Sequence, residues 1–527
     1  MRMKAWQFLA RRGSWRGLAL GLPVLLAGVM AGCVSSPQTH RAPTLVPPWV
    51  GLIEGEGVGS IATGAPTRTP VPVPIWPQQP IQGSPTPDVF RTPPPLRTEA
   101  LIHYVQPGES LSILAERYSV STQTLLLANG ITNADFLAVG QRLVIPPPVV
   151  QPAGPAYKIL PDSEVVFGPA SVGFDVVAEA ARRGGYLAYY RETVEEEPRD
   201  GAAIVQLVAE RYSVNPRLLL ALLEYQSGWL THPDVQAQTL SYPLGYQAQG
   251  WEGLFAQLSW AADMLNRGYY AWRAGWAGPY LLADGSVVPA GPGINAGTAA
   301  VQMLFAQLDG ADRWRWDVGP DGLAGAYEDL FGSPFSRRVE PLVPENLEQP
   351  EMQLPFEPGK AWSFTGGPHS AWGDWAAWAA LDFAPPGQAY GCVTSDEWLV
   401  AAADGLVVRS GDGAVLLDLD GDGFEQTGWV LLYLHIETRD RVPAGVFLKA
   451  GDRIGHPSCE GGVTTGTHVH LARKYNGEWI PADGDIPFNL DGWVSSGAGV
   501  PYDGFLRRGA QELEACACRN EFNQIMR

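Results

Sequence analysis

The stretch Trp429-Val-Leu-Leu-Tyr-Leu-His435, together with Gly466-Thr-His468-Val-His470-Leu471, decides the fold of the C-terminal third of this chain. Around these two stretches, short apolar runs such as Leu399–Val408 and Ala414–Asp418 are divided by Gly and Asp residues. Apolar runs of this length bounded by turn residues are typical of strands and hairpins. The sequence therefore predicts an antiparallel β-sheet in this region.

Five of the eight histidines in the chain lie between His369 and His470. They fall in three motifs: Gly366-Gly-Pro-His369, which is followed by Ala379-Ala-Leu-Asp382; Leu432-Tyr-Leu-His435; and Gly466–Leu471. With Leu448–Gly455, these motifs resemble the lysostaphin/β-lytic family of zinc endopeptidases. The resemblance covers residues 356–493 and predicts a peptidase domain there.

The resemblance implies a role for each of these residues. His369, Asp382 and His470 match the ligands of one Zn²⁺ ion, and His468 and His435 match the two catalytic histidines that do not bind the metal. The residue types fit this chemistry independently, because two imidazoles and one carboxylate leave the fourth tetrahedral position of zinc open for water or substrate. In a His-x-His strand, alternate side chains also share one face of the sheet.

The spacing of the first two ligands departs from the lysostaphin branch, which has only a few residues between them. Here Ser370–Leu381 intervene, and the β-lytic branch has a similarly long insertion. Asp374, inside the insertion, is a competing ligand, but only Asp382 has the Leu-Asp-Phe context of the family. His456 matches no catalytic position, and we interpret it as a loop residue.

The N-terminus has the features of a bacterial export signal. A positive segment from Arg2 to Arg16 precedes the apolar run Leu18–Met30 and then Ala31-Gly-Cys33. This order predicts a signal peptide, and the small residues before Cys33 resemble a lipobox, which implies lipidation of Cys33 and retention at the membrane. The alternative is ordinary signal cleavage with an incidental cysteine. Residues 34–100 are rich in Pro and Thr and predict a stiff tether.

Residues 101–147 predict a compact βααβ unit. Ser110 can cap a helix over Leu111–Tyr118, and a second helix covers Thr122–Asn129. The segment resembles a LysM module, which implies binding of N-acetylglucosamine-containing glycans. By that resemblance, the binding groove lies near Gly108, Glu109, Ser110, Gly130 and Ile131; the alternative is that these residues only close turns.

A short linker (148–156) leads to a predicted helical domain at 157–340. Asn215 before Pro216 predicts a helix start, and the helix after it resembles the first helices of lysozyme-like lytic transglycosylases. The catalytic Glu of that family is replaced by Gln226, and an amide cannot donate the proton that glycoside cleavage needs. Glu224 lies about 200° away around the helix. We therefore interpret this domain as an inactive unit that is structural or holds glycan.

Besides Cys33, four cysteines are present, and an even number in an exported chain suggests disulfides. Cys392 and Cys459 form the favoured pair, since both lie in the predicted peptidase domain. Cys516 and Cys518 are too close for an unstrained bridge, so their partners stay open, as does the role of the predicted tail, 494–527.

A second metal motif is incomplete. Asp418-Leu-Asp420-Gly-Asp422-Gly copies the first half of a calcium loop, but Trp429 occupies the position of the usual bidentate Glu. We therefore expect the tip of a hairpin, with Ca²⁺ binding as the lesser alternative.

The formal net charge of −19 argues against nucleic acid as a partner. Together, these features predict a multidomain α+β protein: a LysM module, a mostly helical domain and an antiparallel-sheet peptidase. We expect it outside the cytoplasm, lipid-anchored and facing the cell wall, where it cleaves stem or cross-bridge peptides of peptidoglycan as a DD- or glycyl-endopeptidase. Two alternatives are a non-catalytic wall-binding protein that recruits other hydrolases, and an extracellular protease of Gly-rich proteins.

Overall fold

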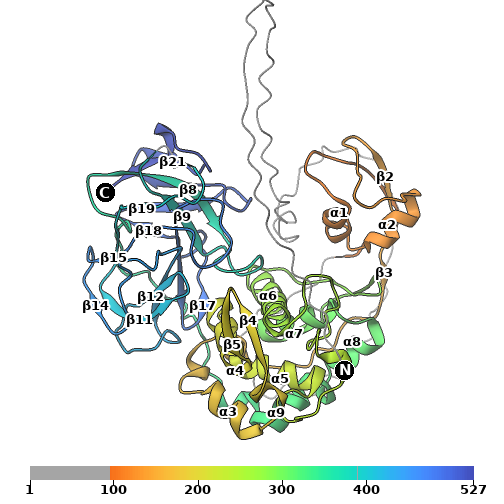
Figure 1. The fold of residues 1–527 in the computed structure, drawn as a ribbon. Coiled ribbons are helices and arrows are strands. Elements are labelled where there is room, and N and C mark those ends of the chain that lie inside the picture. The colour runs from red at the N-terminus through yellow and green to blue at the C-terminus, as the bar shows by residue number, and fades with distance from the viewer. Residues whose placement is uncertain (1–94, 388–389) are drawn as a thin grey trace, which may run out of the picture. The chain divides into compact units, whose positions relative to one another are not determined.

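The computed structural model describes residues 95–387 and 390–527 (Figure 1). The predicted signal peptide, Cys33 and nearly all of the Pro-rich tether lie outside the described residues. In the part of the chain that is described, no helix combines the length and the apolar character needed to cross a membrane.

The LysM segment folds as a βααβ unit, with the two strands paired antiparallel. The side chains of Ser110 and Ser121 accept hydrogen bonds from the first turns of the two helices, which explains where each helix begins. Gly130 ends the second helix in the left-handed conformation, with φ of 60°. The elements are β1 (Leu101–Tyr104), α1 (Leu111–Arg117), α2 (Thr122–Asn129) and β2 (Arg142–Ile145).

The middle of the chain is mostly helical and has one apolar core. α5 begins as the Asn-Pro pair predicts, since Asn215 caps it and Pro216 is its first residue. The aromatic residues of α6 are mainly core: Trp260, Tyr269, Tyr270 and Trp272 are buried. The helices are α3 (Val176–Arg183), α4 (Gly201–Tyr212), α5 (Pro216–Ser227), α6 (Leu254–Arg273), α7 (Ala296–Ala306), α8 (Ala311–Asp317) and α9 (Gly325–Phe331).

Short strands accompany these helices. One is part of the predicted linker, which pairs in parallel with a strand of the helical domain; two others form a hairpin beside α4 (Figure 1). The strands are β3 (Val149–Val150), β4 (Arg191–Val194), β5 (Glu197–Asp200), β6 (Tyr280–Leu281) and β7 (Ser286–Val288).

The C-terminal third forms the predicted antiparallel sheet. Its strand order is β14-β11-β12-β13-β16-β9-β8-β22, with β17 paired to β16. The strands are β8 (Ala361–His369), β9 (Ala380–Ala384), β11 (Gly405–Gly411), β12 (Ala414–Asp418), β13 (Trp429–Leu434), β14 (Phe447–Leu448), β16 (Val469–Tyr475), β17 (Glu478–Trp479) and β22 (Gln524–Met526). Smaller sheets contain β10 (Leu399–Val400), β15 (Arg453–Gly455), β18 (Asn489–Leu490), β19 (Trp493–Gly497), β20 (Gly504–Arg508) and β21 (Gln511–Glu514).

Residues 494–527, predicted as a tail, are folded with the sheet domain. β19 begins at Trp493, and Ile525 in β22 pairs with Trp362 in β8, so the last strand of the chain extends the main sheet. The segments of this region are short and carry charged residues such as Arg507 and Arg508, so they lack the apolar runs that predict the other strands.

The main sheet is buried on both faces. Alternate residues of a strand point to opposite faces. Leu432 and Ala472 belong to the core that also contains the helices, whereas Leu431 and Leu471 belong to a second core on the other face. Helices therefore cover one face of the sheet, which explains why Trp429–Leu434 is apolar throughout.

Polar contacts also join the helices to the sheet. Glu478 in β17 accepts hydrogen bonds from Tyr269 Oη and Arg273 Nε of α6, both at 2.9 Å. Ser213, which follows α4, donates to the carbonyl of Gly477 at 2.7 Å. Glu478, Tyr269 and Ser213 are buried. Buried donors and acceptors need partners of defined position, so these contacts fix how the helices lie on the sheet.

Candidate metal centre

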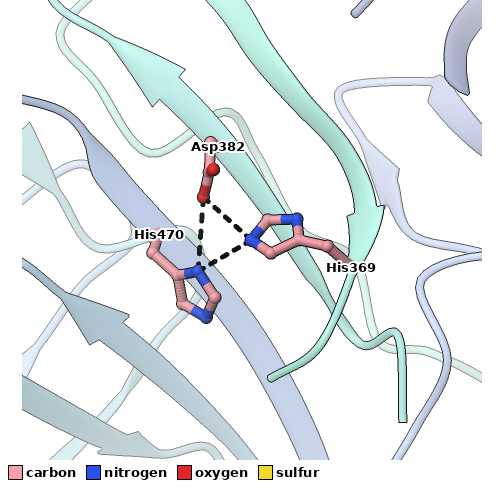
Figure 2. Close-up of side chains that lie close together, drawn as sticks. All are labelled: His369, Asp382 and His470. Atoms are coloured by element: carbon pink, nitrogen blue, oxygen red, sulfur yellow. Dashed lines mark hydrogen bonds and ion pairs between the residues drawn. The ribbon is translucent and has the colours of Figure 1, made fainter. Parts of the chain in front are cut away.

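The two imidazoles and the carboxylate predicted as zinc ligands meet at one point of the sheet (Figure 2). His369 ends β8, Asp382 lies in β9, and His470 lies in β16 directly opposite Asp382. Asp382 Oδ1 is 3.3 Å from both His369 Nε2 and His470 Nδ1, and these two nitrogens are 3.0 Å apart. Ligands about 2.05 Å from a tetrahedral zinc lie about 3.3 Å from one another. The three atoms therefore have the separation that zinc requires.

The outer nitrogen of each imidazole is paired with a backbone carbonyl. His369 Nδ1 lies 2.7 Å from the oxygen of Gly367, and His470 Nε2 lies 3.0 Å from the oxygen of Ala371. If each outer nitrogen donates a proton, the inner nitrogens have free lone pairs.

Those two lone pairs and a buried carboxylate oxygen then face one another with no proton between them. Asp382 Oδ1 receives no hydrogen bond of good geometry from the described residues, and all three side chains are buried. Three converging acceptors repel one another unless a cation lies between them. This donor set fits Zn²⁺.

His468 and His435 lie beside this group. His468 Nε2 is 3.6 Å from Asp382 Oδ1, and the rings of His435 and His468 are 4.6 Å apart between centroids. Each Nδ1 contacts a backbone carbonyl: Gly466 at 2.7 Å for His468, and Glu460 at 2.9 Å for His435. Donation from Nδ1 leaves Nε2 of both rings free to accept a proton.

His435 reaches this cluster through an unusual backbone conformation. Its φ is 67°, in the left-handed region that residues other than Gly rarely adopt. Leu434 faces the helix-covered side of the sheet, so a regular strand would send the next side chain to the other side. The turn at His435 accounts for its place beside His468. Burial, and then the neighbouring His468 and His470, lower the pKa of His435 to about 3, which keeps this imidazole neutral.

The insertion between the first two ligands packs against the helices. Asp374 does not join the three ligand atoms; its backbone N–H donates to Asp263 of α6 at 3.1 Å. Ala371 supplies the carbonyl that faces His470. Trp372 lies against Tyr212, edge to face, with 6.4 Å between ring centroids.

Tyr502 also borders the site, although no sequence pattern distinguishes it from an ordinary turn residue. Its ring stacks on His369, with 4.1 Å between centroids and 20° between planes. Its carbonyl accepts a hydrogen bond from Gly367, and its N–H donates to Pro368. These contacts fix the segment that leads to His369. Burial, followed by the charge of Asp382, raises the pKa of Tyr502 to about 12.

The four cysteines that the structure describes form two disulfides. Cys392 and Cys459 are bonded to each other, which connects two loops beside His468. Cys516 and Cys518, whose partners the sequence leaves open, are also bonded to each other. His456, outside the cluster, is buried against Trp398 and contacts the carbonyl of Glu397.

The three Asp residues of the calcium-like loop lie together. Asp418 accepts hydrogen bonds from the backbone N–H groups of Asp420, Gly421 and Gly423, and Thr427 donates to Asp422. These hydrogen bonds explain why Asp residues occur here: their carboxylates stabilise the turn between β12 and β13.

In the LysM module, the residues predicted near the groove have structural contacts. Gly108 is in the left-handed region, with φ of 86°. Glu109 contacts His103 and accepts from the N–H of Gln106. Ser110 and Gly130 cap the helices, and Ile131 packs against the LysM core.

In the helical domain, the carboxylate of Glu224 accepts hydrogen bonds from the N–H groups of Leu230 and Thr231. It thereby caps the loop after α5, and the position of the transglycosylase Glu is occupied by Gln226.

Comparison with known proteins gives matches in each region. The family models described as "LysM domain" and "LasA, N-terminal domain" match residues 103–146 and 158–344. Protease LasA from two Pseudomonas aeruginosa strains, UCBPP-PA14 and PAO1, is 27% identical over 374 residues, which cover 66% of this chain and 80% of that protein.

Solved structures also match the chain. The M23 metalloprotease pseudoalterin, described as from the deep sea, is 20% identical, with a TM-score of 0.27, and the match covers 34% of this chain and 99% of that one. The catalytic domain of the antimicrobial peptidase lysostaphin from Staphylococcus simulans is 21% identical, with a TM-score of 0.17 and coverage of 23% and 89%. Taken together, the sequence comparisons show a LysM domain, a segment similar to the N-terminal domain of LasA, and similarity to Protease LasA over two thirds of the chain.

Proposed function

We propose that this chain is a zinc endopeptidase that hydrolyses the stem or cross-bridge peptides of peptidoglycan. The observation that carries the proposal is the convergence of His369 Nε2, Asp382 Oδ1 and His470 Nδ1 within 3.0–3.3 Å of one another. Two further histidines lie beside them, and the comparisons support a cell-wall hydrolase.

In this proposal His369, Asp382 and His470 hold the ion. A zinc ion bound by these three residues supplies a Lewis acid that activates water and polarises the scissile carbonyl. His468 accepts the proton of the attacking water at Nε2, because its Nδ1 is paired with the carbonyl of Gly466. His435 completes the pair: because its Nδ1 is paired with the carbonyl of Glu460, its Nε2 accepts a hydrogen bond and helps to orient the attacking water.

The other domains bring the enzyme to its substrate. The LysM module binds the glycan strand near Gly108, Glu109, Ser110, Gly130 and Ile131, and the helical domain has no transglycosylase activity. A lipid on Cys33 and the Pro-rich tether hold the enzyme at the membrane facing the wall. The net charge of −19 does not oppose this substrate, since neutral sugars need no basic surface.

Digestion of purified sacculi tests the proposal. The muropeptides released by the wild-type chain are identified by mass spectrometry, with and without a chelator, and compared with those from H468A. We expect new free amino groups, lost with the chelator and reduced at least about 100-fold in H468A, in the range typical of a general base.

H456A is the matched control, because His456 is a buried histidine of the same domain outside the site. It keeps the wild-type products. New reducing or anhydro ends without free amino groups would show cleavage of glycan instead of peptide, and would contradict both the proposal and the interpretation of the helical domain as inactive. Wall binding without any product would favour the recruiting protein, and cleavage of Gly-rich proteins but not sacculi would favour the extracellular protease.

A further inference from the structure

The orientation of the proposed ligand His470 depends on a segment outside the sheet. His470 Nε2 faces the carbonyl oxygen of Ala371 at 3.0 Å. Ala371 lies in the insertion between His369 and Asp382, in the part that precedes β9 and belongs to no strand. A hydrogen-bond acceptor at the outer nitrogen fixes both the tautomer and the ring orientation of a metal-binding histidine. The position of this insertion therefore affects the position of His470 Nδ1.

Contacts within the insertion give it a compact turn. The N–H of Ala371 donates to the carbonyl of Ala377 at 3.0 Å, and the N–H of Ala379 donates to the same carbonyl at 2.7 Å. Ser370 Oγ donates to the carbonyl of Trp372 at 3.1 Å. Because of these bonds, the tip of the turn and Ala371 move together.

The tip of this turn is held by helix α6. Asp263 Oδ1 accepts hydrogen bonds from the backbone N–H groups of Asp374 and Trp375, both at 3.1 Å. One turn further along α6, the guanidinium of Arg267 lies 4.1 Å from the centre of the Trp375 ring. Two adjacent N–H groups on one oxygen define the position of the turn, because each bond restricts the other.

Gly373 permits this close approach. It has φ of 64°, and a Cβ atom there would lie 2.7 Å from Asp263 Oδ1 and 2.8 Å from Tyr212 Cε1. Any larger residue would therefore push the turn away from the helices.

We propose that Asp263 is a positioning residue for the metal centre: through the turn at Asp374 and Trp375 and the carbonyl of Ala371, it fixes the orientation of His470. The helical domain then contributes to zinc affinity without supplying a ligand. This inference rests on the proposed function, because it requires that His470 binds zinc.

Zinc affinity of the full chain tests the inference, measured by competition with a chromophoric chelator. In D263A the two N–H groups lose their acceptor, and we expect zinc affinity to fall about 10-fold, the lower end of the range for outer hydrogen-bond partners of metal ligands. D263N keeps an oxygen in the same place and should stay within about 2-fold of wild type. Substitution with Co²⁺ adds a second readout, since the intensity of its visible spectrum reports ligand geometry and should change only in D263A.

S213A is the matched control. It removes a hydrogen bond of similar kind between the helices and the sheet, from Ser213 Oγ to Gly477, but does not touch the insertion. Its zinc affinity should equal that of wild type. Wild-type affinity and spectrum in D263A would overturn the inference, as would an equal loss in S213A.

G373A is the second variant and decides the question if D263A does not fold. It displaces the turn from Asp263 without changing α6, so it should reproduce the loss of affinity, and wild-type affinity in G373A would contradict the inference. A wild-type chain that binds no zinc would instead refute the proposed function itself.

Discussion

Replacing Leu432 by Ala tests whether helices cover the face of the sheet that carries the metal centre. Leu432 is 4% exposed and lies in the core shared with the helices, and Leu431 beside it is fully buried in the core on the other face. Leu-to-Ala changes in packed cores cost about 2–5 kcal/mol. Because both side chains are enclosed, we expect each substitution to lower the free energy of unfolding by about 3 kcal/mol.

Guanidinium unfolding of the full chain measures this cost, with far-UV circular dichroism for the helices and tryptophan fluorescence for the whole protein. L431A is the matched control, because its cost does not depend on the helical domain. If the helices left this face open, Leu432 would be a surface residue, and L432A would cost less than about 0.5 kcal/mol. A loss of about 3 kcal/mol in L431A with almost none in L432A would refute the described packing.

Three further outcomes follow from the structure. G477A should lower the free energy of unfolding by more than about 2 kcal/mol, because a Cβ there would lie 2.4 Å from the carbonyl oxygen of Phe167. G484A is the control in thermal unfolding, since Gly484 has a similar φ and open space around it. An equal loss of stability in the two variants would contradict the close contact at Gly477. Burial, and then the charge of Asp374, raise the pKa of Asp263 from 3.8 to about 8. The native state therefore keeps the proton of Asp263 at pH values where the unfolded state has lost it, and the free energy of unfolding of wild type should fall as pH rises from about 4 to about 8. Denaturant titrations at several pH values should show the stability of D263N rising relative to wild type over that window, and a difference that does not change with pH would contradict the raised pKa. Zinc at 100 times its dissociation constant should stabilise the native state by about 2.7 kcal/mol, an increase that calorimetry should detect in wild type and not in H369A.

The sheet and the cluster of histidines could be predicted because both have local signals. Trp429–Leu434 is a continuous apolar run, and His468 and His470 are two residues apart, which puts them on one face of any strand. The LysM helices, too, begin where Ser110 and Ser121 precede apolar residues at helical spacing. Local spacing and capping residues carry this information.

The remaining contacts could not be predicted because they join distant parts of the chain. Asp263 and Trp375 are far apart in sequence, and neither lies in a motif. Tyr502 contacts His369 from a turn whose sequence has no feature that distinguishes it from other turns. The apolar run at Trp429–Leu434 predicts burial but not what covers each face, since helices and a second core leave the same pattern.

The zinc content of the purified, folded chain tests the central claim most directly, with X-ray absorption spectroscopy to identify the ligands. The account predicts one zinc ion per chain, bound by two imidazoles and one carboxylate, and its loss in H470A. A folded chain that takes up no zinc, or an H470A variant that retains the ion with an unchanged spectrum, would contradict it.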